Sequence, residues 1–420
     1  MASEELLSDG LVLRQVRDEQ DVQRYIALND AVVTGEGAFC DRLLHHHPRT
    51  TLDDYSLVED RRTGQVISTT CLIPWRCRYE DVILETAMLE MVATHPEYRR
   101  RGLIRAQVQR FHRMVAERRF DLCIIQGIPF FYRQYGYAYA LDHTPSELLL
   151  ARQIPDRPAD ISSSYSVRPA RLDDAGALAA LYERAMSPYS LAVQRSAEYW
   201  RYLLEWAGHA VRLVEDARLG CPVGYARVSR RAQGAELWVD ESGLTSAEAG
   251  MALLLQLKAE TAAEAAGEIR LAGSPLDTLV RLGRSLGSTP QPCGQWLLRF
   301  PDVAGLLAKI GPVLERRLVR SGYAGLTADL CLNLFREAFV LRFEAGKLSG
   351  VEPAGFVDAS MGADGGDLCI PPEAFVRLVL GYRSLDELRD AWPDIWVRAR
   401  SRYLVEALFP RMSACIWMPY

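Results

Sequence analysis

The stretch 88-MLEMVATHPEYRRRGLIRAQVQRFH-112 decides how the first part of this chain folds. Residues 88–94 are apolar except for Glu90 and Thr94, as expected of a buried strand. After Gly102, apolar residues return at helical spacing, which predicts a helix with one apolar face. Three arginines and a glycine therefore lie between a strand and a helix.

A turn of this composition can bind a phosphate group. The first N–H groups of a helix lack partners inside the helix, and the helix dipole is positive at that end. A glycine lets the backbone approach an anion closely, and nearby arginines add charge-assisted hydrogen bonds. The turn lacks the lysine and Ser/Thr of a Walker loop and the glycine spacing of a dinucleotide site. The alternative is a solvated arginine patch.

The sequence that follows favours the phosphate site. A second buried strand is expected at 120-FDLCIIQG-127, and the aromatic run 128-IPFFYRQYGYAYA-140 is interpreted as a helix. The turn Arg99-x-x-Gly102-x-Ile104 resembles the pyrophosphate-binding turn of the GNAT acetyltransferase superfamily. This resemblance implies that the chain binds acetyl-CoA.

The composition indicates a globular protein of several domains. With 420 residues the chain is longer than one hydrophobic core normally serves. A net charge of −5 argues against a general nucleic-acid binder. Nine scattered cysteines are typical of reduced thiols in a cytoplasmic protein. Neither a signal peptide nor a run of about 18 apolar residues is apparent, so no membrane partner is expected.

Two segments of the chain open in the same way. Residues 11–28 and 165–182 each read as a strand followed by an amphipathic helix, with arginines at similar spacing, which suggests a duplicated domain. Residues 152–164, rich in Pro, Ser and Asp, suit a linker. Signals for strands, turns and short helices follow Pro301, and Ser384 followed by Glu387 is a capping box that predicts a helix start. The predicted domains are 1–150 (α/β), 165–300 (α/β) and 301–420 (α+β).

The second copy lacks the arginine turn. Its corresponding strand is expected at 235-AELWVD-240. Asp240, Glu241 and Glu248 stand around the start of the next helix, where negative charge would repel a pyrophosphate. The second domain is therefore predicted to have lost its cofactor site.

The whole layout resembles the Eis-type (enhanced intracellular survival) N-acetyltransferases. These have two tandem GNAT folds, in an overall α/β (α+β) architecture, followed by a sterol-carrier-protein-like α+β domain. The strongest matches are residues 91–106, 132–137 and 368–389. The resemblance implies a cytoplasmic enzyme without a metal that transfers acetyl from acetyl-CoA to a primary amine. The amine belongs to a small molecule, such as an aminoglycoside, or to a lysine side chain, and the assembly is a homohexamer.

The resemblance also assigns roles to residues. Tyr132 corresponds to the general acid that protonates the leaving thiolate, and the terminal carboxylate of Tyr420 to the base. Glu90, on the strand before the turn, is the alternative base. The implied acetyl-CoA contacts are Val92, Ala93, Thr94, Arg100, Arg101, Gly102, Leu103, Ile104, Arg105, Gly127 and Ile128.

Less specific interpretations compete with these roles. Tyr132 lies among other aromatic residues and could serve packing alone, and Glu90 could form an ion pair. The run His45-His46-His47 has no suitably spaced Cys or carboxylate, so no metal site is expected. The competing function is a catalytically silent GNAT protein that binds acyl-CoA or lipid as a sensor or carrier.

Overall fold

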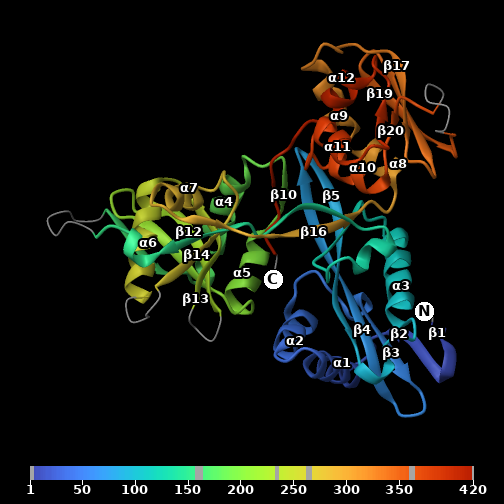
Figure 1. Ribbon diagram of the computed structural model, residues 1–420. Coiled ribbons are helices and arrows are strands. Elements are labelled where there is room, and N and C mark those ends of the chain that lie inside the picture. The colour runs from blue at the N-terminus through green and yellow to red at the C-terminus, as the bar shows by residue number, and fades with distance from the viewer. Residues whose placement is uncertain (1–3, 157–163, 232–235, 262–266, 359–364, 419–420) are drawn as a thin grey trace. The chain divides into compact units, whose positions relative to one another are not determined.

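The computed structural model describes residues 4–156, 164–231, 236–261, 267–358 and 365–418 (Figure 1). By the contacts among its residues the chain divides into two compact units. The first comprises Met1–Leu141 with Gln295–Ala414, and the second Asp142–Gly294 with Cys415–Tyr420.

A mixed sheet runs through the amino-terminal part of the first unit. Its strands lie in the order β1-β2-β3-β4-β5-β6-β16-β7. Neighbours are antiparallel where β2, β3, β4 and β5 meet, whereas β5 and β6 are parallel. The strands are β1 (Glu5–Leu6), β2 (Leu11–Gln15), β3 (Tyr55–Asp60), β4 (Gln65–Tyr79), β5 (Val82–Thr94), β6 (Leu122–Ile125), β7 (Ala138–His143) and β16 (Gly294–Arg299).

Three helices accompany this sheet: α1 (Glu19–Val32), α2 (Glu36–His46) and α3 (Leu103–Glu117). The side chain of Asp18 accepts a hydrogen bond from the Asp21 N–H and so begins α1. Apolar residues of α3 pack with β5 and β6 in one core cluster, which fixes the helix against the sheet. The helix predicted after Gly102 is therefore confirmed.

Two strands lie in other sheets than the order of the chain suggests. The segment β8 (Ser146–Leu150), expected to close the first domain, pairs with β14 (Glu268–Ala272) in the sheet of the second unit. In its place β16, from the far end of the second segment, lies between β6 and β7. The first continuous segment of the first compact unit ends at Leu141.

The second unit is built around a seven-stranded sheet in the order β15-β8-β14-β13-β12-β11-β9. One continuous apolar core joins this sheet to α6. The other strands of this sheet are β9 (Tyr165–Pro169), β11 (Ala210–Asp216), β12 (Cys221–Arg231), β13 (Glu236–Leu244) and β15 (Thr289–Gln291). The short strand β10 (Leu191–Val193) lies outside it, and the helices are α4 (Ala175–Met186), α5 (Ala197–Glu205), α6 (Ala247–Thr261) and α7 (Thr278–Ser285).

The remainder of the first unit is an α+β arrangement, with a five-stranded sheet in the order β19-β18-β17-β20-β21. The predicted capping box of Ser384 and Glu387 begins α11, as expected. The elements are α8 (Val303–Lys309), α9 (Gly311–Val319), β17 (Ala328–Asn333), β18 (Ala338–Glu344), β19 (Lys347–Gly355), β20 (Leu368–Cys369), α10 (Pro372–Val379), α11 (Leu385–Ala391), β21 (Trp396–Val397), α12 (Arg402–Leu408) and β22 (Ala414–Cys415).

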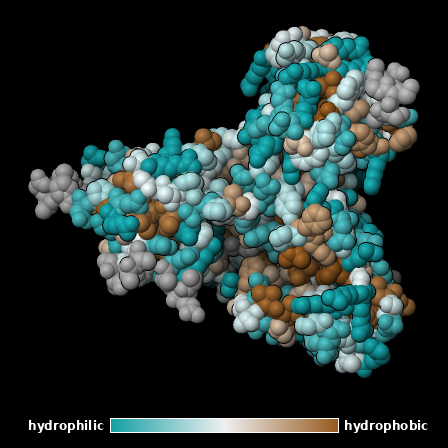
Figure 2. Space-filling view, in the orientation of Figure 1, coloured by the Kyte–Doolittle hydropathy of each residue, from teal (hydrophilic) through white to brown (hydrophobic). Residues whose placement is uncertain are grey.

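Hydrophilic residues cover most of the face seen in Figure 2, and hydrophobic residues gather near α2 and β4. Within the described ranges we find no helix with both the length and the apolar character needed to cross a bilayer.

His47, the last residue of the histidine run, makes the stability of the fold depend on pH. Burial, with Arg49 nearby, lowers the pKa of His47 to about 3. Between pH 6.5 and about 3 the unfolded chain therefore binds a proton that the folded chain refuses, so stability falls as the pH falls through this window. The slope from this residue approaches ~1.4 kcal/mol per pH unit. We expect His47→Gln to reduce the fall in the free energy of unfolding between pH 7.5, 6 and 5, measured by urea unfolding. An equal fall for the parent and the variant would contradict this.

Candidate active site

The turn between β5 and α3 has an open helix N-terminus. Gly102 is the N-cap of α3, with φ 77°, and no side chain caps the helix there. A Cβ at Gly102 would meet no atom within 4 Å, so the left-handed backbone, rather than crowding, favours glycine. The first N–H groups of α3 are therefore free of a side-chain acceptor and can bind an anion.

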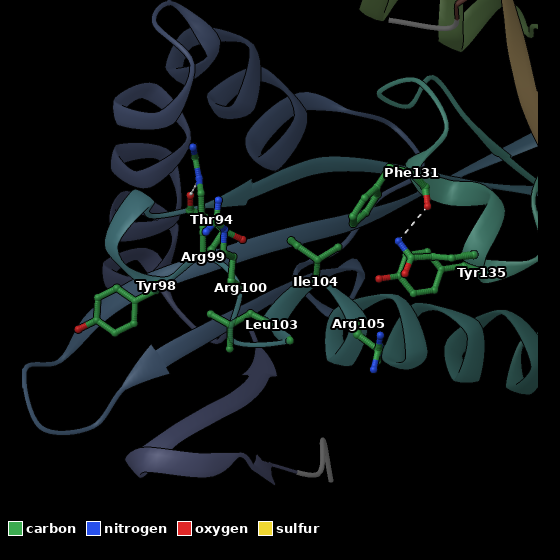
Figure 3. Close-up of a pocket in the computed structure, with 11 residues that line it drawn as sticks. Thr94, Tyr98, Arg99, Arg100, Leu103, Ile104, Arg105, Phe131 and Tyr135 are labelled. Atoms are coloured by element: carbon green, nitrogen blue, oxygen red, sulfur yellow. Dashed lines mark hydrogen bonds between the residues drawn. The ribbon is translucent and has the colours of Figure 1, made fainter.

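A cleft of about 450 Å³ lies at this turn (Figure 3). Ile104 lies between the arginines of the turn and the aromatic side chains of η4 (Phe131–Tyr135). The Arg99 Nε donates to the Thr94 carbonyl at 3.4 Å, which holds this side chain along the strand end. The lining residues are Thr94, Tyr98, Arg99, Arg100, Gly102, Leu103, Ile104, Arg105, Phe131, Gln134 and Tyr135.

The arginines of the turn have different environments. Arg100 and Arg105 line the cleft, and neither forms an ion pair with any residue in the described ranges. Arg101 is not part of the lining; its guanidinium lies 4.8 Å from the centre of the Tyr98 ring. With Arg99, the cleft therefore presents three cationic side chains beside an uncapped helix, which suits a phosphate-bearing ligand.

The other residues predicted to bind the donor lie outside the lining. Val92 packs against the apolar cluster that contains Tyr132, and Ala93 is buried. Gly127 lies against the Tyr132 ring, with which a Cβ at that position would collide. The Ile128 side chain is 64% exposed. Their assignment to the donor stays a prediction.

Tyr132 lies within η4 and is 4% exposed. Its ring packs edge-on against Phe131 and Tyr137, at centroid distances of 5.1 and 6.3 Å. Burial raises the pKa of the Tyr132 phenol well above its ordinary value, and the nearby Glu90 carboxylate raises it further. The phenol therefore carries its proton at neutral pH and can donate it.

Glu90 lies where β5 is irregular. Cys71 pairs with Glu90 but Thr69 pairs with Ala93, so β5 has one residue more than β4 across this bulge. Met91 has φ 52°, a left-handed conformation that costs about 1–2 kcal/mol in a residue with a Cβ. Its N–H lies 3.3 Å from the Glu90 carboxylate. The bulge thus brings a partly buried carboxylate beside Tyr132.

Among the described residues of the second unit, the turn between β13 and α6 is not comparably open. Its strand β13 continues to Leu244, past the predicted end at residue 240, so Glu241 lies within the strand. Glu241 is buried and paired with Arg195 at 2.7 Å, which corrects the prediction that its charge faces a phosphate site. The Ser246 hydroxyl accepts from the Ala249 N–H, and Glu248 lies in the first turn of α6. A capped helix start with an acidic first turn disfavours an anion.

The predicted base Tyr420 lies outside the described residues, and its role stays a prediction. The described end of the tail is held within the second unit: Arg195 and Arg227 donate to the Met418 carbonyl at 2.9 and 3.3 Å.

Five lining residues were not predicted as site residues: Tyr98, Arg99, Phe131, Gln134 and Tyr135. The signal was present for four of them, because Arg99 opens the recognised turn and the other three lie in the aromatic run. Only Tyr98 has no pattern of its own.

Comparison with known proteins agrees with this geometry. The acetyltransferase (GNAT) domain family matches residues 13–140. The N-acetyltransferase Eis of Mycobacterium tuberculosis (strain ATCC 25177 / H37Ra) is 32% identical over 131 residues, which is 30% of this chain and 32% of that protein. The match thus spans about a third of the relative's length.

Two solved structures are similar over more of the chain. The crystal structure of Eis1 from Mycobacterium abscessus has a TM-score of 0.65 and 18% identity, covering 97% of this chain and 100% of that one. Saccharomyces cerevisiae N-myristoyltransferase with bound myristoyl-CoA has a TM-score of 0.51 and 11% identity, covering 71% and 84%.

Residues 13–140 therefore match an acetyltransferase (GNAT) domain, and the chain shares its α/β fold with Eis1 from Mycobacterium abscessus. Over about a third of its length N-acetyltransferase Eis is similar to this chain, which agrees with the resemblance found in the sequence.

Proposed function

We propose that the first unit is an N-acetyltransferase that uses acetyl-CoA and acetylates a primary amine. The observation that carries this proposal is the uncapped start of α3 beside Arg100 and Arg105. A pyrophosphate fits these groups, because backbone N–H donors and the side chains of Arg99, Arg100 and Arg105 lie at one cleft. The GNAT match over residues 13–140 supports the same donor class.

The buried polar residues supply the proton transfers. Tyr132 donates its phenolic proton to the departing thiolate sulfur and regains a proton from solvent. Glu90 accepts a proton from the attacking amine, directly or through a water, and the carboxylate of Tyr420 is the alternative acceptor. The acceptor is a small-molecule amine, including an aminoglycoside, or a lysine side chain. By the family resemblance, the residues after Pro301 form a sterol-carrier-like domain and the protein assembles as a homohexamer.

Thiol release tests this function directly. The protein is incubated with acetyl-CoA, a panel of amines and a thiol-detecting reagent, and we expect amine-dependent release of CoA above the hydrolysis background. Tight binding of acetyl-CoA without release for any amine would favour the competing function, a silent acyl-CoA sensor or carrier. Absence of acetyl-CoA binding would refute the proposed donor itself.

A further inference from the structure

A buried chain of hydrogen bonds ends at the bulge in β5. The Asn29 amide of α1 lies 3.1 Å from the Thr69 hydroxyl of β4. That hydroxyl lies 3.1 Å from the Met91 carbonyl and donates to it. The three residues are 4%, 0% and 5% exposed, so no bulk water competes for these bonds. The carbonyl of the one left-handed residue described in β5 is thus held by a side chain of the neighbouring strand.

The bulge changes which face of β5 points toward the cleft. Before it, Ala87 and Leu89 pack in the apolar cluster that contains Tyr132; after it, Val92 packs there. Side chains alternate in a regular strand, so the extra residue reverses the alternation. Thr94 follows Val92 on that face and lines the cleft. Without the bulge its side chain would point to the opposite face.

A second set of contacts fixes the strand end after the reversal. The Ser68 hydroxyl lies 2.9 Å from both the Thr94 hydroxyl and the Ala93 carbonyl. The Gln107 amide of α3, fully buried, donates to Ser68 at 3.0 Å. The end of β5 is therefore tied to the helix whose N-terminus forms the anion site.

We propose that Thr69 is a positioning residue: its hydroxyl holds Met91 in the left-handed conformation and so presents Thr94, with the strand end, to the donor cleft. This inference rests on the proposed function, because it concerns the cleft that binds acetyl-CoA. A buried threonine can satisfy its hydroxyl with a carbonyl close by in its own strand, so it does not need an acceptor on the neighbouring strand such as the Met91 carbonyl. Thr86, on the same hairpin and fully buried, donates to the Leu84 carbonyl two residues away, at 3.2 Å.

Thr86 supplies a matched control, since Thr69→Val and Thr86→Val each remove one buried hydroxyl from the hairpin. We expect Thr69→Val to speed amide hydrogen exchange at residues 91–94 at least tenfold and to weaken CoA binding in calorimetry about tenfold. Thr69→Ser, which keeps the hydroxyl, retains most of the affinity. Thr86→Val leaves exchange at residues 91–94 and CoA affinity within twofold of the parent. Equal behaviour of the two valine variants overturns the proposal.

A double-mutant cycle with Met91→Gly isolates the mechanism. Glycine adopts a positive φ readily, so Met91→Gly removes the need for the clamp. The effect of Thr69→Val on CoA affinity should shrink from about tenfold to under threefold when both changes are combined. An unchanged effect would mean that the hydroxyl acts in another way. If the unaltered protein fails to bind CoA, the proposed function fails, while hydrogen exchange at residues 91–94 still decides whether Thr69 holds the bulge.

Discussion

Tyr132→Phe should lower kcat for amine acetylation by about 10² or more while acetyl-CoA binding stays intact. The substitution removes only the hydroxyl, and the ring keeps its contacts with Phe131 and Tyr137. Because burial raises the pKa of the Tyr132 phenol, the hydroxyl is protonated throughout the neutral pH range, and its loss removes a proton donor. Steady-state kinetics with varied acetyl-CoA, together with calorimetry, separates the effect on turnover from any effect on binding.

Tyr135→Phe is the matched control. Tyr135 lies in the same turn and lines the cleft, but it is more exposed than Tyr132. We expect its loss of a hydroxyl to act on the KM for acetyl-CoA more than on kcat. If Tyr132→Phe turns over within a factor of two of the parent, another group protonates the thiolate and Tyr132 serves packing alone.

Replacing Arg100 and Arg105 together by alanine should raise the KM for acetyl-CoA at least tenfold. Charge-assisted hydrogen bonds contribute about 1.5–3 kcal/mol each in favourable geometry, and solvent screening at these exposed positions reduces that figure. The fold should persist, because neither side chain forms an ion pair in the described part of the chain. Raising the ionic strength should weaken binding by the parent more than by the double variant.

Two further variants calibrate this result. Arg113→Ala removes an exposed arginine from the same helix, one that pairs with Glu5 at 2.5 Å away from the cleft, and should leave the KM unchanged. Arg101→Ala should have a smaller effect than Arg100→Ala, since Arg101 stacks on Tyr98 and is not part of the lining. If the KM of the Arg100/Arg105 double variant equals that of Arg113→Ala, the arginine turn does not bind the donor and is a solvated surface.

Local sequence patterns predicted those elements whose formation depends mainly on neighbouring residues. The spacing of apolar residues after Gly102 predicted α3, and Ser384 with Glu387 predicted the start of α11. The aromatic run 128–140 was wrongly interpreted as a helix. Positive φ angles at Phe130 and Gly136 confine its helical part to the short turn η4, and β7 begins at Ala138.

Long-range pairing was the part that local patterns could not predict. Glu241 looked like a surface charge, yet Arg195, more than forty positions earlier, neutralises it inside the core. The bulge at Met91 depends on a threonine of the preceding strand and an asparagine of the first helix. The pairing of β8 with β14 likewise depends on residues far away in the sequence, and the residues that flank β8 do not indicate it.

The place of β16 sets the order in which the protein can be completed during synthesis. Until the ribosome has made Arg299, β6 has no neighbour on one side and β7 has no route into the sheet. The edge of β6, which is apolar and can pair with other chains, therefore stays unpaired until the whole second segment has been synthesised. The sheet beside the proposed donor cleft is therefore begun first and closed late, since Leu297 of β16 belongs to the same apolar cluster as Tyr132.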